Sequence, residues 1–134
     1  MDTQQTTIFE MAGGEPAFTR IVARFYDGVS GDPTLRAMYP ADLTESKRHM
    51  VLFLMQYFGG PRTYGEERGH PRLRMRHAPF VIGQTERDAW MRHMKAAVNA
   101  ENLPHEIEKL LLDYFERTAT FMMNRHDGSL PILR

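Results

Sequence analysis

Apolar side chains recur every three or four residues in four stretches of the chain, and this spacing predicts four long helices. The first spans residues 15–30, with Pro16 in its first turn, where the missing N–H of proline costs nothing. The second spans residues 44–58 and is apolar on nearly every side after Met50, as in a helix buried by neighbours on more than one face. The apolar stripe of the first helix consists of Phe18, Ile21, Val22, Phe25 and Val29.

The other two predicted helices lie in the second half of the chain. The third starts near Thr85, whose hydroxyl can cap the turn that contains Asp88. The fourth begins at Pro104. Their apolar stripes are Trp90, Met94, Ala97 and Val98 in the third helix, and Ile107, Leu110, Leu111, Tyr114, Thr118 and Phe121 in the fourth.

No stretch alternates apolar and polar residues with period two, so the predicted fold class is all-α. The length fits a single domain over residues 1–134, with its core at about 8–125. Residues 128–134 are predicted to form a flexible tail.

The segment from residue 61 to residue 84 has no long periodic pattern, and loops of this length in a compact domain are usually functional or disordered. Pro71 could open a short helix there, and Pro79 should end it. In such a helix Leu73 and His77 share one face at i and i+4, which turns His77 inward. An inward histidine is either a neutral imidazole bonded to a carbonyl or a metal ligand. The arginines on the helix, which we expect to point elsewhere, are Arg72, Arg74 and Arg76.

Charge and composition exclude several classes of function. The chain has 17 basic and 17 acidic residues, and a net charge of zero argues against a general nucleic-acid binder. It has no cysteine, which excludes disulfides, thiolate metal sites and covalent c-type haem attachment. The N-terminus lacks the pattern of a signal peptide, and the longest apolar run, residues 50–55, is far shorter than the roughly 20 residues of a membrane span. We therefore expect a cytoplasmic protein without membrane or nucleic-acid partners.

The segment at residues 61–84 is locally basic, with five arginines against Glu66 and Glu67. An inward histidine beside outward arginines suits a ligand that is apolar inside and anionic at its edge. Haem has this character, because its iron takes an axial imidazole and its two propionates extend from an apolar ring. The competing interpretation is a basic module that binds RNA or another polyanion, which predicts a colourless protein and salt-sensitive binding.

The stretch FLMQYFGGPRTYGEERGHPRLRMRHAPFVI, followed by ERDAW, closely resembles the signature of the second group of truncated haemoglobins. The glycine pairs at 13–14 and 59–60 also stand where that family has them, and the resemblance covers residues 8–124. It implies a shortened globin in which two helices pack over two around non-covalent haem b. It also implies a long, mostly irregular segment before the proximal histidine.

Residue by residue, the resemblance assigns the two sides of the haem. His77 falls on the proximal iron ligand, and the distal donors are Tyr26, Tyr39 and Trp90. Ser46 falls on the position of the distal histidine of ordinary globins. The other implied haem contacts are Met50 one turn beyond Ser46, Tyr64 and Arg76 at the propionates with Arg74 as a weaker candidate, and Phe53, Leu54, Leu73 and Phe80 along the wall.

The sequence departs from the family pattern at two positions. Phe58 replaces a tryptophan seen in many relatives, and Met50 replaces leucine or glutamine. The remaining histidines have no metal-ligand spacing and are expected to be structural or exposed, with a reservation for His49 because it precedes Met50. They are His49, His70, His93, His105 and His126.

For function, the resemblance implies reversible binding of dioxygen at ferrous haem, with nitric oxide, carbon monoxide or peroxide as other small ligands. Distal donors retain and polarise such ligands, which fits detoxification of nitric oxide or peroxide by a nitric oxide dioxygenase or a peroxidase-like enzyme. Such an enzyme would draw electrons from an unidentified reductase. The alternative is a non-catalytic ligand sensor, or a protein for oxygen supply and transport. Dimers occur in the family, so a homodimer is a further expectation.

Overall fold

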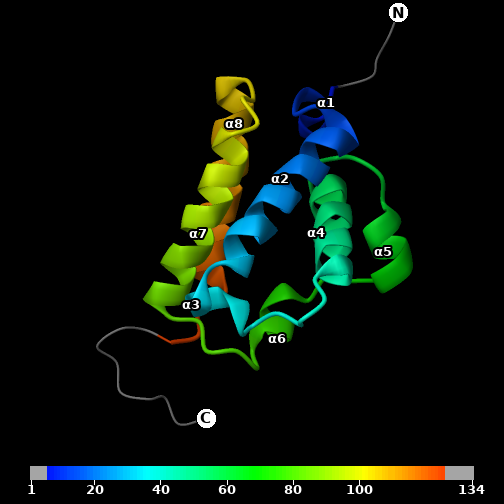
Figure 1. The fold of residues 1–134 in the computed structure, drawn as a ribbon. Coiled ribbons are helices and arrows are strands. Elements are labelled where there is room, and N and C mark those ends of the chain that lie inside the picture. The colour runs from blue at the N-terminus through cyan, green and yellow to red at the C-terminus, as the bar shows by residue number, and fades with distance from the viewer. Residues whose placement is uncertain (1–5, 126–134) are drawn as a thin grey trace, which may run out of the picture.

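The computed structural model describes residues 6–125, and every regular element in that range is a helix (Figure 1). The predicted tail at 128–134 and His126 lie outside the described residues. Four helices are long and four are short. The helices are α1 Ile8–Met11, α2 Gly14–Ser30, α3 Pro33–Arg36, α4 Thr44–Tyr57, α5 Thr63–Arg68, α6 Leu73–His77, α7 Gln84–Asn99 and α8 His105–Phe121.

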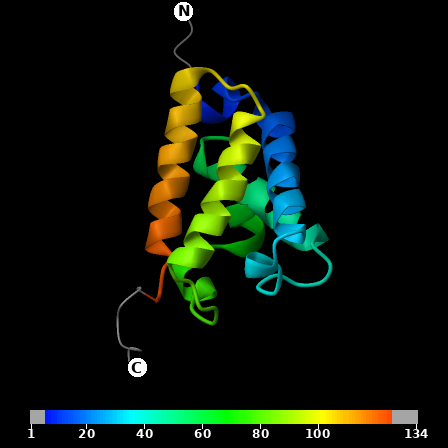
Figure 2. The ribbon, with the colours of Figure 1, turned by 60° about the vertical axis from the view of Figure 1, so that its left-hand side comes forward.

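The four long helices form two layers, with α2 and α4 in one layer and α7 and α8 in the other. Helix α2 packs against both α4 and α7, and α7 packs against α8 (Figures 1 and 2). The short helices α3 and α6 lie at the end of the bundle away from α1, and α5 lies outside α4 (Figure 1). This is the two-over-two arrangement that the family resemblance implies.

The predicted stripes of α2 and α7 are confirmed as core, except that Trp90 is only half-buried. In α8 the prediction is wrong at two positions, because Leu110 is 46% exposed and Phe121 is 58% exposed. The buried face of α8 is instead centred nearer Phe115 and Ala119. A stripe drawn with i+3 and i+4 steps can drift to the edge of the true apolar face, since the helical period is 3.6 residues.

Helix α4 is less buried than its apolar sequence predicts. Only Leu54 and Met55 are buried within the helix, whereas Met50 and Phe53 are half-buried and Tyr57 is exposed. The physical reason is that Met50 and Phe53 line a cavity rather than the close-packed core.

The ends of α6 and α7 also differ from prediction. Helix α6 begins at Leu73 rather than Pro71, because Arg72 takes a left-handed backbone conformation with φ of 48°. At α7 the N-cap is Gly83, whose N–H donates to Glu86 Oε1 over 2.8 Å, so Thr85 lies inside the first turn and does not cap it.

Three short helices were not predicted, because they are too short to show a helical period. They are α1, α3 and α5. Two of them carry clear caps: Thr7 and Glu10 form a capping box at α1, and Asp32 accepts from the Thr34 N–H at α3, with Pro33 in the first turn. None of the helices in residues 6–125 is long and apolar enough to cross a membrane.

Candidate functional site

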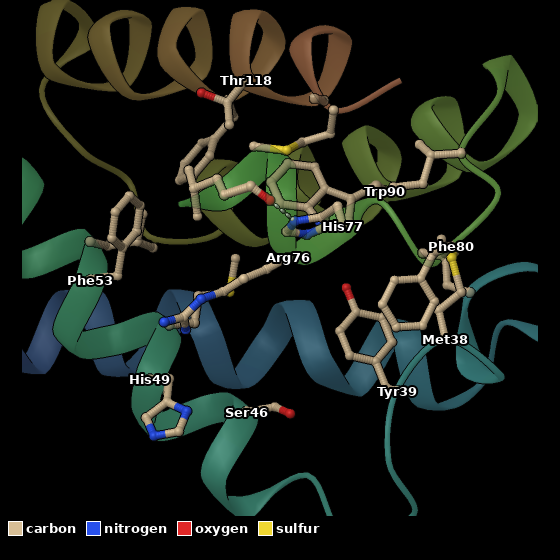
Figure 3. A pocket seen from close by; sticks show the side chains of 18 of the residues that line it. Met38, Tyr39, Ser46, His49, Phe53, Arg76, His77, Phe80, Trp90 and Thr118 are labelled. Carbon is tan, nitrogen blue, oxygen red and sulfur yellow. Dashed lines mark hydrogen bonds between the residues drawn. The ribbon is translucent and has the colours of Figure 1, made fainter. Parts of the chain in front are cut away.

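A cavity of about 530 Å³ opens between α4, α6, α7 and α8 and contains nearly all the predicted site residues (Figure 3). Its volume falls in the range of roughly 300–1,000 Å³ that is typical of cofactor and ligand pockets. The predicted residues that line it are Tyr26, Tyr39, Ser46, Met50, Phe53, Leu54, Tyr64, Leu73, Arg76, His77, Phe80 and Trp90. Arg74 does not line it.

His77 is the last residue of α6, and its ring is oriented by its own helix. The Nδ1 atom lies 2.6 Å from the carbonyl oxygen of Leu73, one turn earlier. Because a carbonyl oxygen only accepts, Nδ1 carries the hydrogen and Nε2 keeps its lone pair. The Leu73–His77 relationship predicted from i and i+4 spacing therefore fixes both the tautomer and the direction of the imidazole, as in second-shell orientation of metal-binding histidines.

Asn124, just after α8, holds the turn that follows α6. The Ile82 N–H donates to Asn124 Oδ1 over 2.8 Å, and Asn124 Nδ2 donates to the Phe80 carbonyl over 2.6 Å. In the backbone, the Asn124 N–H donates to the Ile82 carbonyl over 2.9 Å. These bonds hold the segment that follows His77 against the end of α8.

Two tyrosines and a tryptophan bring polar groups to the wall of the cavity. The rings of Tyr26 and Tyr39 meet edge to face, with centroids 5.5 Å apart, and Trp90 packs on Phe25 at 5.1 Å. The Tyr39 hydroxyl points into the cavity (Figure 3). Tyr26 comes from α2, Tyr39 from the corner after α3 and Trp90 from α7.

Burial keeps both tyrosines in their protonated form. It raises the pKa of the Tyr26 phenol, and the neighbouring Tyr39 adds to the rise. It raises the pKa of Tyr39 to about 12, against a hydrogen bond from the Trp90 side chain that acts in the opposite direction. Both phenols therefore retain an O–H that can donate to a ligand at neutral pH.

The corner that carries Tyr39 is held by Arg36 from α3. Arg36 Nη1 donates to the carbonyl oxygens of Tyr39 and Pro40 over 3.2 and 3.0 Å, and Nη2 donates to that of Ala41 over 2.9 Å. These three bonds fix the irregular stretch from Tyr39 to Ala41. They give Tyr39 a defined position although it lies outside any helix.

Positive and polar side chains gather at the edge of the cavity. Arg76 Nη1 donates to the Tyr64 hydroxyl over 3.4 Å, and Arg68 Nη1 donates to His49 Nε2 over 3.2 Å. Burial, followed by the nearby Arg68 charge, lowers the pKa of His49. Ser46 and His49 both project from α4 at this edge (Figure 3).

Two expectations about the arginines of α6 were wrong. Arg76 does not point away from the site but lines the cavity together with His77. Arg74, the weaker candidate for a propionate contact, donates to the Phe121 carbonyl oxygen and lies over the Phe121 ring at 5.3 Å. Its guanidinium is therefore directed to α8 and away from the cavity.

Within residues 6–125, the histidines set aside as structural or exposed behave accordingly, apart from His49, which lines the cavity. His70 Nδ1 accepts from the Arg72 N–H over 3.0 Å, and His93 Nε2 donates to Asp32 Oδ2 over 2.7 Å. The described residues contain no cluster of three or more metal-ligating side chains.

Several lining residues were not predicted. Tyr114 and Thr118 lie on the apolar stripe of α8, which was a usable signal for an inward position. Arg68, Arg87 and Met38 gave no such signal, because their inward placement depends on contacts between distant segments. Arg87, for example, pairs with Glu116 of α8.

The donor set fits haem. The cavity offers one imidazole with a free lone pair on Nε2, an apolar wall that includes Met50 and Phe53, and cationic groups at the edge. An iron porphyrin needs an axial imidazole, apolar contact for its ring and partners for two carboxylates. Arg76 and Tyr64 are the side chains placed to serve as those partners.

Comparison with known proteins agrees with this interpretation. Residues 7–124 match the family model described as bacterial-like globin. The chain is 44% identical to the group 2 truncated haemoglobin YjbI of Bacillus subtilis, over 86% of this chain and 87% of that protein. Among solved structures, the haemoglobin of Chloroflexus aurantiacus aligns with a TM-score of 0.89 and 58% identity, over 90% of this chain and all of that one. The truncated oxygen-avid haemoglobin of Bacillus subtilis aligns with a TM-score of 0.84 and 43% identity, over 89% and 100% of the two chains.

Proposed function

Because the chain belongs to the group 2 truncated haemoglobins, oxygen-binding globins whose cofactor is haem b, we propose that it retains dioxygen through distal donors and uses it to detoxify nitric oxide. Reduction of peroxide is the second reaction that the same donors support. The observation that carries the proposal is the convergence of Tyr26, Tyr39 and Trp90 on the cavity that His77 enters.

Bound haem supplies a ferrous iron that takes small gas ligands in the cavity. His77 would hold it through Nε2, since Nδ1 is committed to the Leu73 carbonyl. Arg76 and Tyr64 would hold the propionates, and Met50, Phe53, Leu54 and Phe80 would enclose the ring. Ser46 is too short to reach a ligand easily, so it leaves the side route into the cavity less obstructed.

The distal donors stabilise negative charge that develops on the outer atom of a ligand. Hydrogen bonds to a charged acceptor are stronger than neutral ones, and a water-poor cavity strengthens them further. The raised pKa values of Tyr26 and Tyr39 keep both O–H donors available. The same donors polarise an O–O bond, which supports peroxide reduction.

Each conversion of nitric oxide and dioxygen to nitrate consumes one electron from the protein. A reductase must therefore return that electron before the next cycle. An oxygen-avid relative, as the Bacillus subtilis structure is described, supports a protein that keeps dioxygen for reaction rather than for supply.

Stopped-flow mixing of the oxygen-loaded protein with nitric oxide tests the proposal. We expect loss of the oxygenated spectrum within the mixing time and one nitrate per haem, with dioxygen release by itself far slower. Rapid, reversible release without nitrate formation would contradict the proposal and favour a sensor or an oxygen-supply protein. Peroxide consumption by the ferric protein tests the second reaction separately.

A further inference from the structure

Tyr57 joins the surface of α4 to the wall of the cavity through its ring contact with Tyr114. Its side chain is 51% exposed, and its ring lies on that of Tyr114 with centroids 4.1 Å apart and 34° between the planes. Tyr114 is only 7% exposed and lines the cavity. A continuous aromatic path therefore runs from the haem cavity to solvent in a single step between two phenols.

A second aromatic contact reinforces this path. Phe53 lines the cavity, and its ring centroid lies 6.1 Å from that of Tyr57. Electron transfer falls steeply with distance and is favoured by rings in van der Waals contact. The Tyr57 phenol is thus coupled to the cavity through both Tyr114 and Phe53.

Exposure distinguishes Tyr57 from the other tyrosines. Of the five in the chain, Tyr26, Tyr64 and Tyr114 are buried and Tyr39 is half-buried, so only Tyr57 presents its ring to solvent. A phenol that loses an electron becomes strongly acidic and must give up its proton. Burial raises the pKa of Tyr114, whereas Tyr57 can pass a proton directly to water.

We propose that Tyr57 is a surface redox site, from which electrons pass through Tyr114 to the haem cavity when peroxide is reduced there. This inference rests on the peroxide reaction put forward above. Tyr114 relays the electron between Tyr57 and the cavity. The tyrosyl radical then resides on Tyr57, whose exposed phenol can release its proton to water. The site would accept electrons from phenolic or protein reductants too large to enter the cavity.

The reaction balances without a further co-reactant. Hydrogen peroxide takes up two electrons and two protons to form two waters. Two Tyr57 phenols, on two protein molecules, each lose one electron and one proton. In the absence of another reductant, the two tyrosyl radicals form one carbon–carbon bond between their rings, and the product is a dityrosine-linked dimer.

Peroxide treatment of the haem-loaded protein tests the site. We expect dimers that resist denaturation and show dityrosine fluorescence, and we expect Tyr57→Phe to lose both. Phenylalanine keeps the ring stacked on Tyr114, so the fold and peroxide consumption with a small phenolic reductant should be unchanged. Tyr114→Phe should slow dimer formation. Equal dityrosine in Tyr57→Phe and the unaltered protein would overturn the proposal.

A light-driven experiment separates this site from the peroxide reaction. Zinc protoporphyrin replaces haem, and a cobalt(III) ammine complex accepts the electron released on illumination. We expect the same Tyr57-dependent dimer. Loss of peroxide consumption with a retained light-driven dimer would contradict only the peroxide reaction. Absence of a Tyr57-dependent dimer under illumination would contradict the redox site itself.

Discussion

His93 of α7 donates from Nε2 to Asp32 Oδ2 over 2.7 Å, and this bond joins α7 to the N-terminus of α3. Asp32 also accepts from the Thr34 N–H and lies 3.5 Å from Arg92 Nη2. Tyr39 follows α3, and Trp90 precedes His93 by one turn of α7. The His93–Asp32 bond therefore ties together the two segments that carry distal donors.

Because of this contact, we expect the free energy of unfolding to change with pH in the acidic range. The hydrogen bond from His93, and then that from the Thr34 backbone, lower the pKa of the Asp32 carboxyl. A carboxyl whose pKa is lower in the folded than in the unfolded protein stabilises the fold at pH values above its unfolded pKa of about 3.9. This stabilisation is lost as the pH falls through the pKa of the folded protein. Urea unfolding should show Asp32→Asn less stable than the unaltered protein at pH 7, with the difference shrinking towards about pH 3. A difference that stays constant over this range would contradict the assignment.

Gly28 lies against the other side of the His93 ring. A Cβ at position 28 would collide with His93 Nδ1, whereas a Cβ at Gly31 would meet nothing within 4 Å. Gly28→Ala should therefore lower the free energy of unfolding by about 1–3 kcal/mol, as for other overpacked sites. Gly31→Ala is the matched control and should be close to neutral in the same urea titration. Equal effects of the two substitutions would show that the His93 contact is not rigid.

The indole N–H of Trp90 is expected to slow dioxygen release. Trp90→Phe keeps an aromatic ring beside Phe25 but removes the donor. Loss of a hydrogen bond to a charged acceptor should raise the release rate constant by about tenfold or more. Laser photolysis and stopped-flow displacement by carbon monoxide measure this rate. An unchanged rate would remove Trp90 from the set of donors.

Dioxygen release should also be insensitive to pH on the alkaline side. Burial raises the pKa of Tyr26 and raises that of Tyr39 to about 12, so both keep their protons at pH values where an exposed tyrosine, with a pKa of about 10, titrates. The release rate constant should stay constant from about pH 6 to about pH 10. A rise in this rate near pH 10 would mean that a donor phenol titrates normally.

The long helices and the inward direction of His77 follow from local signals in the sequence, whereas most of the other cavity residues were assigned through family resemblance. Long apolar stripes predict α2 and α7, and the i and i+4 spacing of Leu73 and His77 predicts the inward imidazole. The distal roles proposed for Tyr26 and Trp90 came only from family resemblance, because a buried aromatic residue is usually part of the core.

Features that depend on distant parts of the chain were not predictable. Asn124 holds the turn at Ile82 across 42 positions of sequence, and Arg74 turns to Phe121 rather than to the cavity. The half-burial of Met50 has the same origin, since an apolar helix face reads alike whether it meets a core or a cavity. Periodicity reports which face turns inward but not what fills the space beyond it.

Haem binding through His77 is tested most directly by titrating haem into the protein and recording the reduced spectrum before and after addition of carbon monoxide. We predict a stoichiometric Soret band that shifts with carbon monoxide. His77→Ala should lose the band or bind haem far more weakly while retaining its helical circular dichroism. His70→Ala should match the unaltered protein, because His70 bonds only the Arg72 backbone. An unaltered protein without a Soret band, or a His77→Ala variant with the same spectrum and affinity, would contradict the account.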